Sequence, residues 1–487
     1  MTDTNPFALL PLDNRPISYL LPKQIAEFAG IDLILPERKY LGDLNKGSDL
    51  EYIEKWCRGL INQTPTLVIS LDNCVYGGLT QSRQHNFALD KLKKRVGALH
   101  AASLRNVYAF SSIMRIPNYN NSDEEKEYWK EQGEKIFRWS ELMHKVGRGI
   151  KDDEHSHEVL IEKWYESTKA LPPEVLTDYK SLREKNFAVN LLWLESLHEN
   201  YFDYLIFSCD DSSQYGMNVI EADYLKGEIK KHRFSDKAKV ISGTDEIPLV
   251  LLTKAVLKNT GVKPAISLYF NSQKGKDEPA RYESGSIYNS VKSHLDILGI
   301  ETTDLNTADI ALCIHTADSL QGDHIFGKKP PDTEKNANEL VNFLVKTNKP
   351  FIILDLAYAN GSDPNLIKHL ISSDINWDNC YGYSGLNTCS NSIGVLLAIG
   401  ICRWAGEKNE KKKEFNLKAF KKCLLLRFLD DYAFQAEIRN PNITFSEINE
   451  KIKPYARTFT KILGLSDINV NCSLPWNRSF EIEINVL

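Results

Sequence analysis

The chain has 487 residues, of which 42% are hydrophobic and 26% charged, and its formal net charge at pH 7 is -5. These values are ordinary for a soluble globular protein with a large core, and they exclude a disordered or collagen-like chain. Because the chain has no basic excess, we expect no nucleic-acid partner. Because its longest apolar run, residues 393–402, is too short to cross a bilayer, we expect no membrane partner.

Cysteine usage indicates the compartment. The nine cysteines are irregularly spaced and include no Cys-x-x-Cys pair. This favours free, mostly buried thiols in a reducing environment over a disulfide framework. The first residues show no signal-peptide pattern. We therefore expect a cytoplasmic protein.

Short apolar runs alternate with helical patterns along the first 111 residues, as in α/β proteins. The runs show little alternation of polar and apolar residues, which is typical of strands buried on both faces of a parallel sheet. The expected strands are residues 7–12, 31–35, 66–71 and 106–111, and the expected helices between them are residues 19–28, 50–61 and 88–101.

The strand rhythm stops after residue 111. Residues 124–144 and 175–197 have helical patterns, so we expect a helical insertion at about residues 115–200, which often forms the wall or lid of a site. The rhythm then resumes, with expected strands at 204–209, 239–242, 265–270, 310–315, 351–354 and 380–384, helices at 248–257, 286–298, 336–347 and 392–404, and a terminal strand-like segment at 480–486.

About ten core strands predict an α/β protein with a mainly parallel sheet. We expect a (β/α)8-barrel-like core with a helical insertion, and two doubly wound α/β domains split near residue 260 would fit nearly as well. The expected organisation is an α/β domain at residues 1–260, a second α/β part at 261–410 that completes the site, and a C-terminal helical and short β extension at 411–487.

Five of the apolar runs end in carboxylates. Parallel sheets place ligand sites at the carboxyl ends of their strands, so we expect these side chains to share one rim. Such a rim suits an uncharged, hydroxyl-rich substrate, or a cation or metal. The acidic residues are Asp13, Asp72, the pair Asp210 and Asp211, the pair Asp245 and Glu246, and Asp355.

The two acidic pairs are the candidate catalytic residues. Two adjacent buried aspartates are costly to ionise together, so the pKa of one of them tends to rise. In the pair Asp210 and Asp211, that residue would be a general acid while its neighbour stays ionised. Asp245 and Glu246 are the alternative catalytic pair or bind the substrate. Glu246 could equally complement the dipole of the helix that follows it.

Turn residues beside the same strand ends are candidate substrate ligands. Two prolines stiffen the turn that carries Asp13 and Arg15, and paired glycines at 77 and 78 let a ligand approach the backbone. Asparagine amides both donate and accept hydrogen bonds, as sugar hydroxyls do, although turn or cap roles stay open for Asn360 and Asn391. The expected substrate ligands are Asp13, Arg15, Asp72, Tyr76, Arg83, Tyr215, Asp355, Tyr358, Asn360, Asn387 and Asn391.

Nine segments spread along the chain form a specific pattern. They are PLDNRP at 11–16, LGD at 41–43, SLDNCVYGGLTQSR at 70–83, residues 110–115, CDDSSQYG at 209–216, GTDE at 243–246, DLAYANGSDP at 355–364, GLNTCSNSIG at 385–394 and LPWNRSFE at 474–481. With them the chain resembles, over nearly its whole length, the bacterial family catalogued as domain of unknown function 4127. That family name implies no activity. The resemblance supports the location of the site more than the reaction.

A second resemblance is one of pattern. Paired aspartates after one strand, Thr-Asp-Glu after the next, and an aspartate followed by Tyr and Asn after a later one look like the order in barrel glycosidases that release N-acetylglucosamine. This resemblance implies that Asp210 steadies the substrate's acetamido group, whose oxygen attacks, and that Asp211 is the acid/base. The insertion before Tyr204 and the strands around residues 265–315 depart from that barrel.

We therefore expect a hydrolase that acts on a small carbohydrate-like substrate, namely a glycosidase that uses paired carboxylates. An N-acetylhexosaminidase is one such enzyme. We expect no cofactor and no resident metal. Two alternatives stay open: a metal-dependent enzyme with Mg²⁺ or Mn²⁺ on the same carboxylates, and a carbohydrate- or polyol-binding protein without catalysis. Both a monomer and a homo-oligomer are compatible with the sequence. The chain has no GxGxxG after the first strand and no GxSxG, which disfavours a dinucleotide-dependent dehydrogenase and a serine hydrolase.

Overall fold

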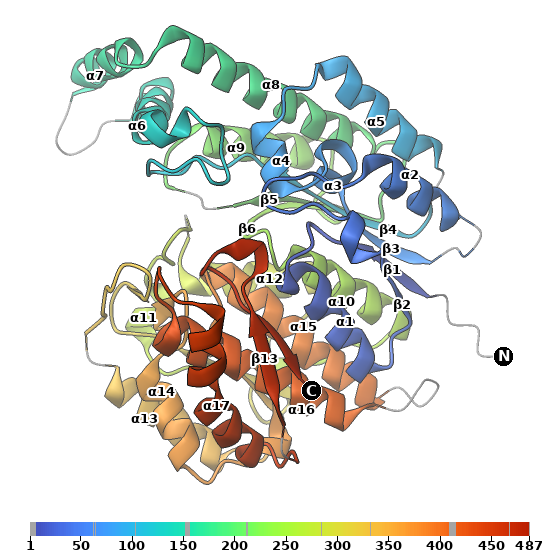
Figure 1. Ribbon diagram of the computed structural model, residues 1–487, viewed down its shortest axis with the longest axis vertical. Coiled ribbons are helices and arrows are strands. Elements are labelled where there is room, and N and C mark those ends of the chain that lie inside the picture. Colours follow the sequence, from blue (N-terminus) through green and yellow to red (C-terminus); the bar gives the residue numbers. More distant parts are fainter. Residues whose placement is uncertain are drawn as a thin grey trace.

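The core strands form two open parallel sheets (Figure 1). The computed structural model describes residues 6–486 except 62, 64, 103, 151–155, 211–212, 284, 332, 409–414 and 467. Six strands in the order β2-β1-β3-β4-β5-β6 make the first sheet, and four in the order β12-β10-β8-β7 make the second.

The expected barrel closure is therefore not present in this described part of the chain. A barrel needs its end strands to pair, whereas β2 and β6 each have one strand neighbour. After β6 an apolar helix leads the chain across to the second sheet. The alternative of two separate sheets describes the fold, with the division between residues 242 and 266.

The first sheet is built from runs of Leu, Ile, Val and Phe whose side chains are mostly buried. All neighbouring strands pair in parallel, and Phe7 lies opposite Leu33 on one side and Thr66 on the other. Parallel pairing brings every carboxyl end to the same edge. The strands are β1 (Phe7–Leu10), β2 (Leu33–Ile34), β3 (Thr66–Ser70), β4 (Val107–Ile113), β5 (Tyr204–Cys209) and β6 (Ala238–Ser242).

The strand order reverses at β1. Helix α1 (Pro16–Ala29), which follows β1, packs on the face toward the second sheet, whereas α2 (Leu50–Gly59), which precedes β3, packs on the outer face. A crevice forms where chain segments leave neighbouring strands toward opposite faces. The turn with Asp13 follows β1 and Asp72 follows β3, so both acids lie beside this crevice.

Helices cover the outer face of the first sheet, at the top of Figure 1. Helices α6, α7 and α8 come between β4 and β5, and α6 and α8 share a small apolar core that includes Trp129 and Tyr179. Besides α2, the outer helices are α3 (Leu71–Tyr76), α4 (Leu79–Gln84), α5 (Leu89–Ala101), α6 (Trp129–Gly147), α7 (His157–Lys169), α8 (Pro173–Glu195) and α9 (Met217–Lys231).

A layer of helices lies between the two sheets and shares an apolar core with both. It consists of α1, α10 (Ile247–Thr260), α12 (Ile287–Leu298) and α15 (Cys389–Lys408). Helix α15 is apolar around its circumference because it is enclosed on all sides. Among the described residues it is the one helix long and apolar enough to cross a membrane, and that stretch is buried inside the protein, as in the core helix of a soluble protein.

The second sheet carries its other helices on the face away from the first sheet. Its strands are β7 (Ile266–Phe270), β8 (Ile310–His315), β10 (Phe351–Asp355) and β12 (Cys380–Ser384). The helices on that face are α13 (Glu334–Lys346), α14 (Pro364–Ser372), α16 (Leu417–Arg427) and α17 (Phe445–Ile462). Smaller elements are α11 (Gln273–Asp277), the paired strands β9 (Gly322–Asp323) and β11 (Tyr358–Ala359), and the 3-10 turns Arg38–Tyr40, Trp377–Asn379 and Pro475–Asn477.

The end of the chain returns to the boundary between the sheets. Helix α16 continues as a π-helix, η3 (Phe428–Ile438), a form that is rare and often found at functional sites. An antiparallel hairpin of β13 (Val470–Ser473) and β14 (Glu483–Val486) then runs up toward the first sheet (Figure 1). We call residues 474–482, which connect these two strands, the hairpin loop.

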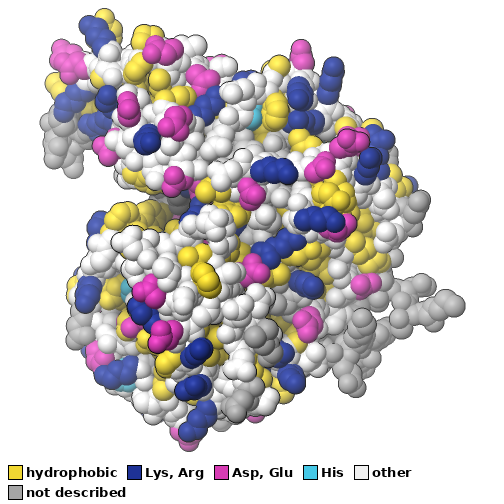
Figure 2. Space-filling view, in the orientation of Figure 1, with side chains coloured by type: hydrophobic (Ala, Val, Ile, Leu, Met, Phe, Trp, Pro, Cys, Tyr) yellow, Lys and Arg dark blue, Asp and Glu magenta, His cyan; other side chains and the backbone are white. Residues whose placement is uncertain are grey.

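The distribution of surface charge and the state of the cysteines match what the composition predicts. On the face drawn in Figure 2, charged side chains of both signs are interspersed, and no single large basic patch is seen. All nine cysteines are free; Cys74 and Cys209 are half-buried and the others are buried. The expectation of free, mostly buried thiols is confirmed.

Candidate functional site

The carboxyl ends of both sheets and the hairpin loop enclose one cleft. It consists of two adjoining hollows, which share Arg15, Asp245, Asn387 and Phe480 as lining residues. We call them the amide pocket and the arginine pocket. The amide pocket is also lined by Asn360, Asn391, Asp430, Gln435, Arg439 and Glu481, and the arginine pocket by Arg115, Glu124, Asp210, Trp476 and Arg478.

Arg15 joins two of the strand-end acids. It lies at the N-terminus of α1, before Pro16, and is 6% exposed. Its Nε donates to Asp13 at 2.8 Å, and its two terminal nitrogens donate to the two carboxylate oxygens of Asp245 at 3.1 and 2.6 Å. Asp13 follows β1 and Asp245 follows β6, so this bidentate contact holds two distant turns of the first sheet together.

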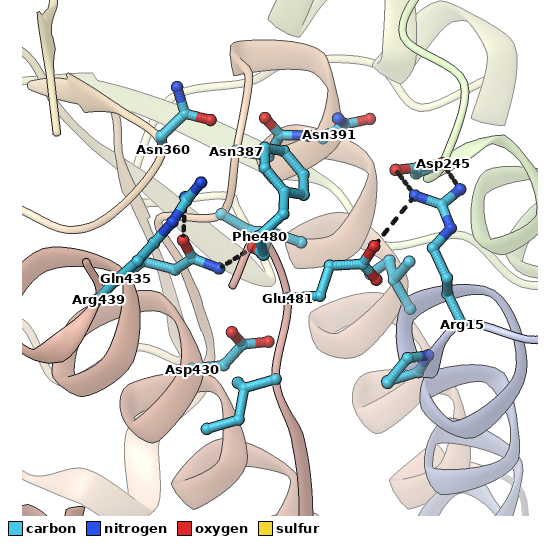
Figure 3. A pocket seen from close by; sticks show the side chains of 14 residues that line it. Arg15, Asp245, Asn360, Asn387, Asn391, Asp430, Gln435, Arg439, Phe480 and Glu481 are labelled. Atoms are coloured by element: carbon cyan, nitrogen blue, oxygen red, sulfur yellow. Dashed lines mark hydrogen bonds and ion pairs between the residues drawn. The ribbon is translucent and has the colours of Figure 1, made fainter. Parts of the chain in front are cut away.

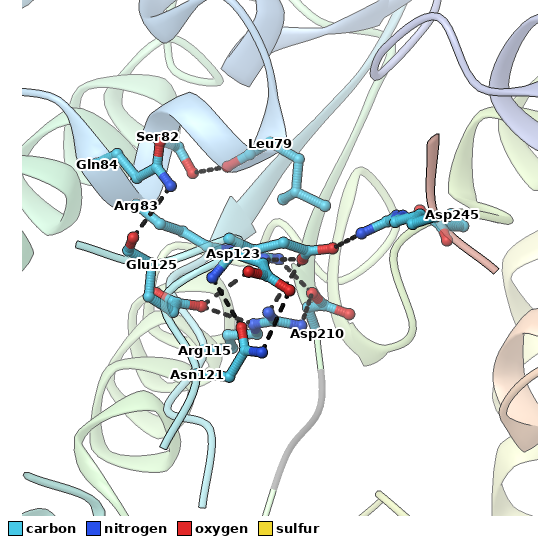
Figure 4. A network of polar contacts seen from close by, with 12 residues as sticks. Leu79, Ser82, Arg83, Gln84, Arg115, Asn121, Asp123, Glu125, Asp210 and Asp245 are labelled. Carbon is cyan, nitrogen blue, oxygen red and sulfur yellow. Dashed lines mark hydrogen bonds and ion pairs between the residues drawn. The ribbon is translucent and has the colours of Figure 1, made fainter. Parts of the chain in front are cut away.

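Two buried arginines hold Asp210 and the acids of the loop before α6 (Figure 4). Arg83, near the end of α4, donates to Asp210, and Arg115, after β4, lies 3.7 Å from the same carboxylate. Both arginines also pair with Glu124 and Glu125 at 2.8 to 3.8 Å. Burial raises the pKa of Glu125. The pKa of Glu124 is lowered despite burial, because neighbouring guanidinium groups favour its charged form.

The hairpin loop ties the end of the chain to this network. The indole nitrogen of Trp476 donates to Asn14 at 2.7 Å, and Arg478 donates to Glu124 at 2.5 Å. Trp476 has φ 57°, which is unusual for a bulky side chain. Its surroundings hold this conformation, since Arg15 and Arg478 both lie over its ring, at 5.2 and 4.6 Å.

Glu481 is the titratable group of the hairpin loop. Arg478 donates to it at 2.7 Å and Arg15 lies 3.8 Å away (Figure 3). Burial raises the pKa of Glu481 to about 7, and the two guanidinium groups oppose this rise. At neutral pH the carboxyl therefore exists in both protonation states, which suits a group that gives and takes a proton.

Three asparagines contribute amides to the other side of the cleft. Asn360 and Asn387 have φ values of 61° and 47°, a left-handed conformation that asparagine tolerates better than most residues. The backbone N–H of Asn360 donates to the carbonyl of Asn387 at 2.7 Å, which links the turns after β10 and β12. The buried Oδ1 of Asn391 has no hydrogen-bond partner among the described residues.

Glu246 does not reach the cleft, although its neighbour Asp245 does. Its side chain is fully buried at the start of α10, with one oxygen 3.5 Å from His294 and the other without a partner in the described part of the chain. Gly243 and Gly394 leave the space that it fills, because a Cβ atom on either would meet its side chain. Burial raises the pKa of Glu246.

Asp355 belongs to a separate buried cluster at the carboxyl end of the second sheet. One of its oxygens accepts from the backbone N–H of Asp363 at 2.8 Å and from the Tyr383 hydroxyl at 2.9 Å. Burial raises its pKa to about 6. His315 pairs with Asp363 at 2.7 Å in the same cluster. This acid does not line the cleft.

Six further expected ligands also lie outside the lining of the cleft. Asp13 and Arg83 contact the lining residues Arg15 and Asp210, and the other four are Asp72 and three tyrosines. Asp72 is buried, accepts from the backbone N–H of Ser112 at 2.8 Å, and has a pKa raised to about 7 by burial. Each of the three tyrosines packs on a histidine instead: Tyr76 on His85, Tyr215 on His144 and Tyr358 on His324. Asp211, the expected acid/base, lies outside the described residues.

Sequence reasoning missed several residues of the cleft. Arg115, Arg478 and Glu481 were not among the expected site residues, although residues 110–115 and 474–481 belong to the pattern that identified the family resemblance. The charged residues in those segments were the available signal. Arg439 follows η3, in a part of the chain without any such motif.

The acids of the cleft are paired with arginines. Within the residues that the structure describes, no group of three or more His, Cys, Asp and Glu side chains could hold a metal ion. The cleft can instead donate and accept hydrogen bonds from amides, offer aromatic faces, and supply carboxyls in more than one protonation state.

Comparisons with known proteins give the family of the chain. Neither the curated proteins nor the solved structures include a match to it. A family model does match, and it covers residues 7–485, which include both sheets and the hairpin loop. The chain therefore belongs to the family described as protein of unknown function (DUF4127).

Proposed function

We propose that the protein is a hydrolase of a sugar derivative, a glycosidase whose active site is the cleft. Glu481 carries the proposal: its carboxyl has a pKa near 7 and lies beside the Arg15–Asp245 pair. Glycoside hydrolysis needs one carboxyl that is protonated and one that is ionised, and different surroundings can hold two carboxyls in these two states.

Each acid has a distinct role in this proposal. Glu481 donates its proton to the glycosidic oxygen as the bond to the leaving group breaks, and a water molecule then adds to the anomeric carbon and returns a proton to Glu481. Asp245, whose oxygens both accept from a guanidinium group, stabilises the positive charge that develops on the sugar ring. Asp210 is a second carboxylate held by arginines. Asp211, the acid/base expected from the sequence, is the alternative to Glu481 in this role.

The remaining lining suits a sugar. The amides of Asn360, Asn387 and Asn391 can each donate to and accept from hydroxyl groups or an acetamido group, so an N-acetylhexosaminide is one candidate substrate. Phe480, shared by both pockets, offers a ring face on which the C–H side of a sugar can pack.

The test is hydrolysis of a panel of nitrophenyl glycosides, including N-acetylhexosaminides, by wild type and Glu481→Gln. We expect the variant to lower kcat by about a hundredfold. We expect a much smaller loss with dinitrophenyl glycosides, whose leaving group departs without a proton. The wild-type kcat should fall as the pH rises through about 7, where Glu481 loses its proton, and the variant should lack this fall.

The control is Glu450→Gln, which removes the same charge from an exposed position on α17. Wild-type turnover of nitrophenyl glycosides by Glu481→Gln would contradict the role of Glu481. The same assay with Asp211→Asn tests the alternative acid. Loss of activity with a chelator, restored by Mg²⁺ or Mn²⁺, would favour the metal-dependent alternative, and sugar binding without any turnover would favour a binding protein.

A further inference from the structure

Arg439 differs from the other arginines that line the cleft. Each of the others has a carboxylate partner: Arg15 has Asp245 at 2.6 Å, Arg115 has Glu125 at 2.9 Å, and Arg478 has Glu481 at 2.7 Å. Arg439 lines the amide pocket and forms no ion pair with any described residue.

The structure nevertheless fixes the guanidinium group of Arg439. One terminal nitrogen donates to the side-chain oxygen of Gln435 at 2.7 Å, and the group lies 4.8 Å from the centre of the Phe480 ring. Figure 3 shows it beside Gln435, directed toward Asn360 and the pocket. Burial lowers its pKa to about 10, so it is charged at neutral pH. A partly buried charge without a partner is costly, and an anionic ligand would offset that cost.

The acids around Arg439 have other partners. Asp323 accepts from the Tyr282 hydroxyl at 2.5 Å, Asp430 from Arg427 at 3.0 Å, and Glu481 from Arg478 at 2.7 Å. None of them approaches Arg439 closely enough to form an ion pair. These acids act on Arg439 only at a distance, so its guanidinium group keeps hydrogen-bond donors that none of them uses.

We propose that the substrate carries an anionic group, a carboxylate or a phosphate, that binds Arg439 in the amide pocket. A guanidinium group can donate two parallel hydrogen bonds to such a group. The amide pocket extends from Arg439 past Phe480 and the asparagines to Glu481 and Asp245. An acidic sugar would then lie with its anion at Arg439 and its reacting bond at Glu481. The inference rests on the proposed function for the reaction, and the binding of the anion is testable without turnover.

The experiment is titration calorimetry of the full-length protein with three probes: glucuronate, glucose 6-phosphate and glucose. The variants are Arg439→Gln, which removes the charge, and Arg439→Lys, which keeps the charge but not the paired donors. The matched control is Arg457→Gln, an exposed position on α17 that loses the same charge. Circular dichroism verifies the fold of each variant.

We expect at least one acidic probe to bind wild type about tenfold or more tightly than glucose. Preference for glucuronate identifies a carboxylate, and preference for glucose 6-phosphate identifies a phosphate. Arg439→Gln should abolish the preference for the acidic probe over glucose, and Arg439→Lys should retain part of it. Arg457→Gln should behave like wild type.

The inference is overturned if wild type binds neither acidic probe at millimolar concentration, binds all three probes equally, or keeps its preference in Arg439→Gln. These outcomes are distinct from failure of the proposed function. If the protein hydrolyses neutral glycosides and shows no preference for an anionic probe, the proposed glycosidase activity stands and the proposed role of Arg439 is rejected. If anion binding depends on Arg439 but no glycoside is hydrolysed, the role of Arg439 stands and the glycosidase activity is rejected.

Discussion

At the scale of single residues, Asp72 links the fold to pH. Its ordinary pKa is 3.8, and burial raises it to about 7 in the folded protein. Between these values the folded state binds more protons than the unfolded chain, so this residue makes the free energy of unfolding fall as the pH rises from about 4 to about 7. Its contribution is present at low pH and lost above pH 7.

Replacement of Asp72 by Asn should remove this dependence. The amide oxygen can still accept from the N–H of Ser112, so the fold should persist. At about 1.4 kcal/mol per pKa unit, the variant should gain at most about 4 kcal/mol over wild type between pH 4 and pH 8. Urea unfolding at both pH values measures this difference. Asp90→Asn, on the exposed side of α5, is the control, and a difference that does not change with pH would contradict the prediction.

Neighbouring residues show where prediction from the sequence ended. The strand-end pattern singled out Asp245 and Glu246 alike, whereas in the structure Asp245 lines the cleft and Glu246 is fully buried. The turn before α10 directs these two side chains into different environments, and long-range contacts of the folded chain determine the geometry of that turn. Glu481 could not be predicted as a site residue for another reason. Its raised pKa comes from burial against residues that are far away in the sequence.

At the scale of elements, helix α15 is packed as closely as glycine allows. A Cβ atom on Gly394 would lie 2.3 Å from Cγ of the fully buried Glu246. Gly394→Ala should therefore lower the free energy of unfolding by about 1–3 kcal/mol. Gly97→Ala, in α5, meets no atom within 4 Å and should instead raise it by up to about 1 kcal/mol. Chemical denaturation compares the two, and equal effects would contradict the role of packing.

The hairpin loop should serve the site more than the fold. Replacement of residues 475–481 by Gly and Ser at the same length leaves the strand residues Cys472 and Ile484 in the apolar core. We expect the melting temperature to change little and glycoside hydrolysis to fall by at least about a hundredfold. Asn485→Ala, at an exposed position on β14, is the control. Activity that survives the loop replacement would rule out a catalytic role for Glu481.

The strands were the elements that the sequence predicted best. The expected strands at residues 204–209, 310–315 and 380–384 are β5, β8 and β12 with the same bounds, and these short, mostly apolar segments are buried almost throughout. The local apolar runs predict single strands but not which strands pair with each other. For this reason the sequence fits a closed barrel and two open sheets nearly equally well. The choice depends on α10, α12 and α15, which fill the space between the sheets.

At the scale of the whole molecule, the two sheets share one apolar core. It includes Leu9 and Phe110 from the first sheet, Leu312 and Leu354 from the second, and Leu396 from α15 between them. Neither sheet can lose its structure without exposing the helices that serve both.

We therefore expect the sheets to unfold together. Hydrogen exchange followed by mass spectrometry across a urea series should show β4 and β10 losing protection at the same urea concentration. Midpoints that differ between these two strands would show that the sheets are independent folding units, as the division into residues 1–260 and 261–410 would suggest.

The hairpin loop also bears on how the protein is made. Ribosomes synthesise a chain from its N-terminus, and domains generally fold as they emerge. Arg38 meets Glu483 across 445 positions of sequence, and Glu481 lies just before that contact. The core strands of both sheets end at Ser384, so they are all synthesised before Glu481, the proposed proton donor. Under the proposed mechanism, a product that stops before residue 474 can form the strands of both sheets but lacks Glu481, so it should be folded without hydrolysing glycosides.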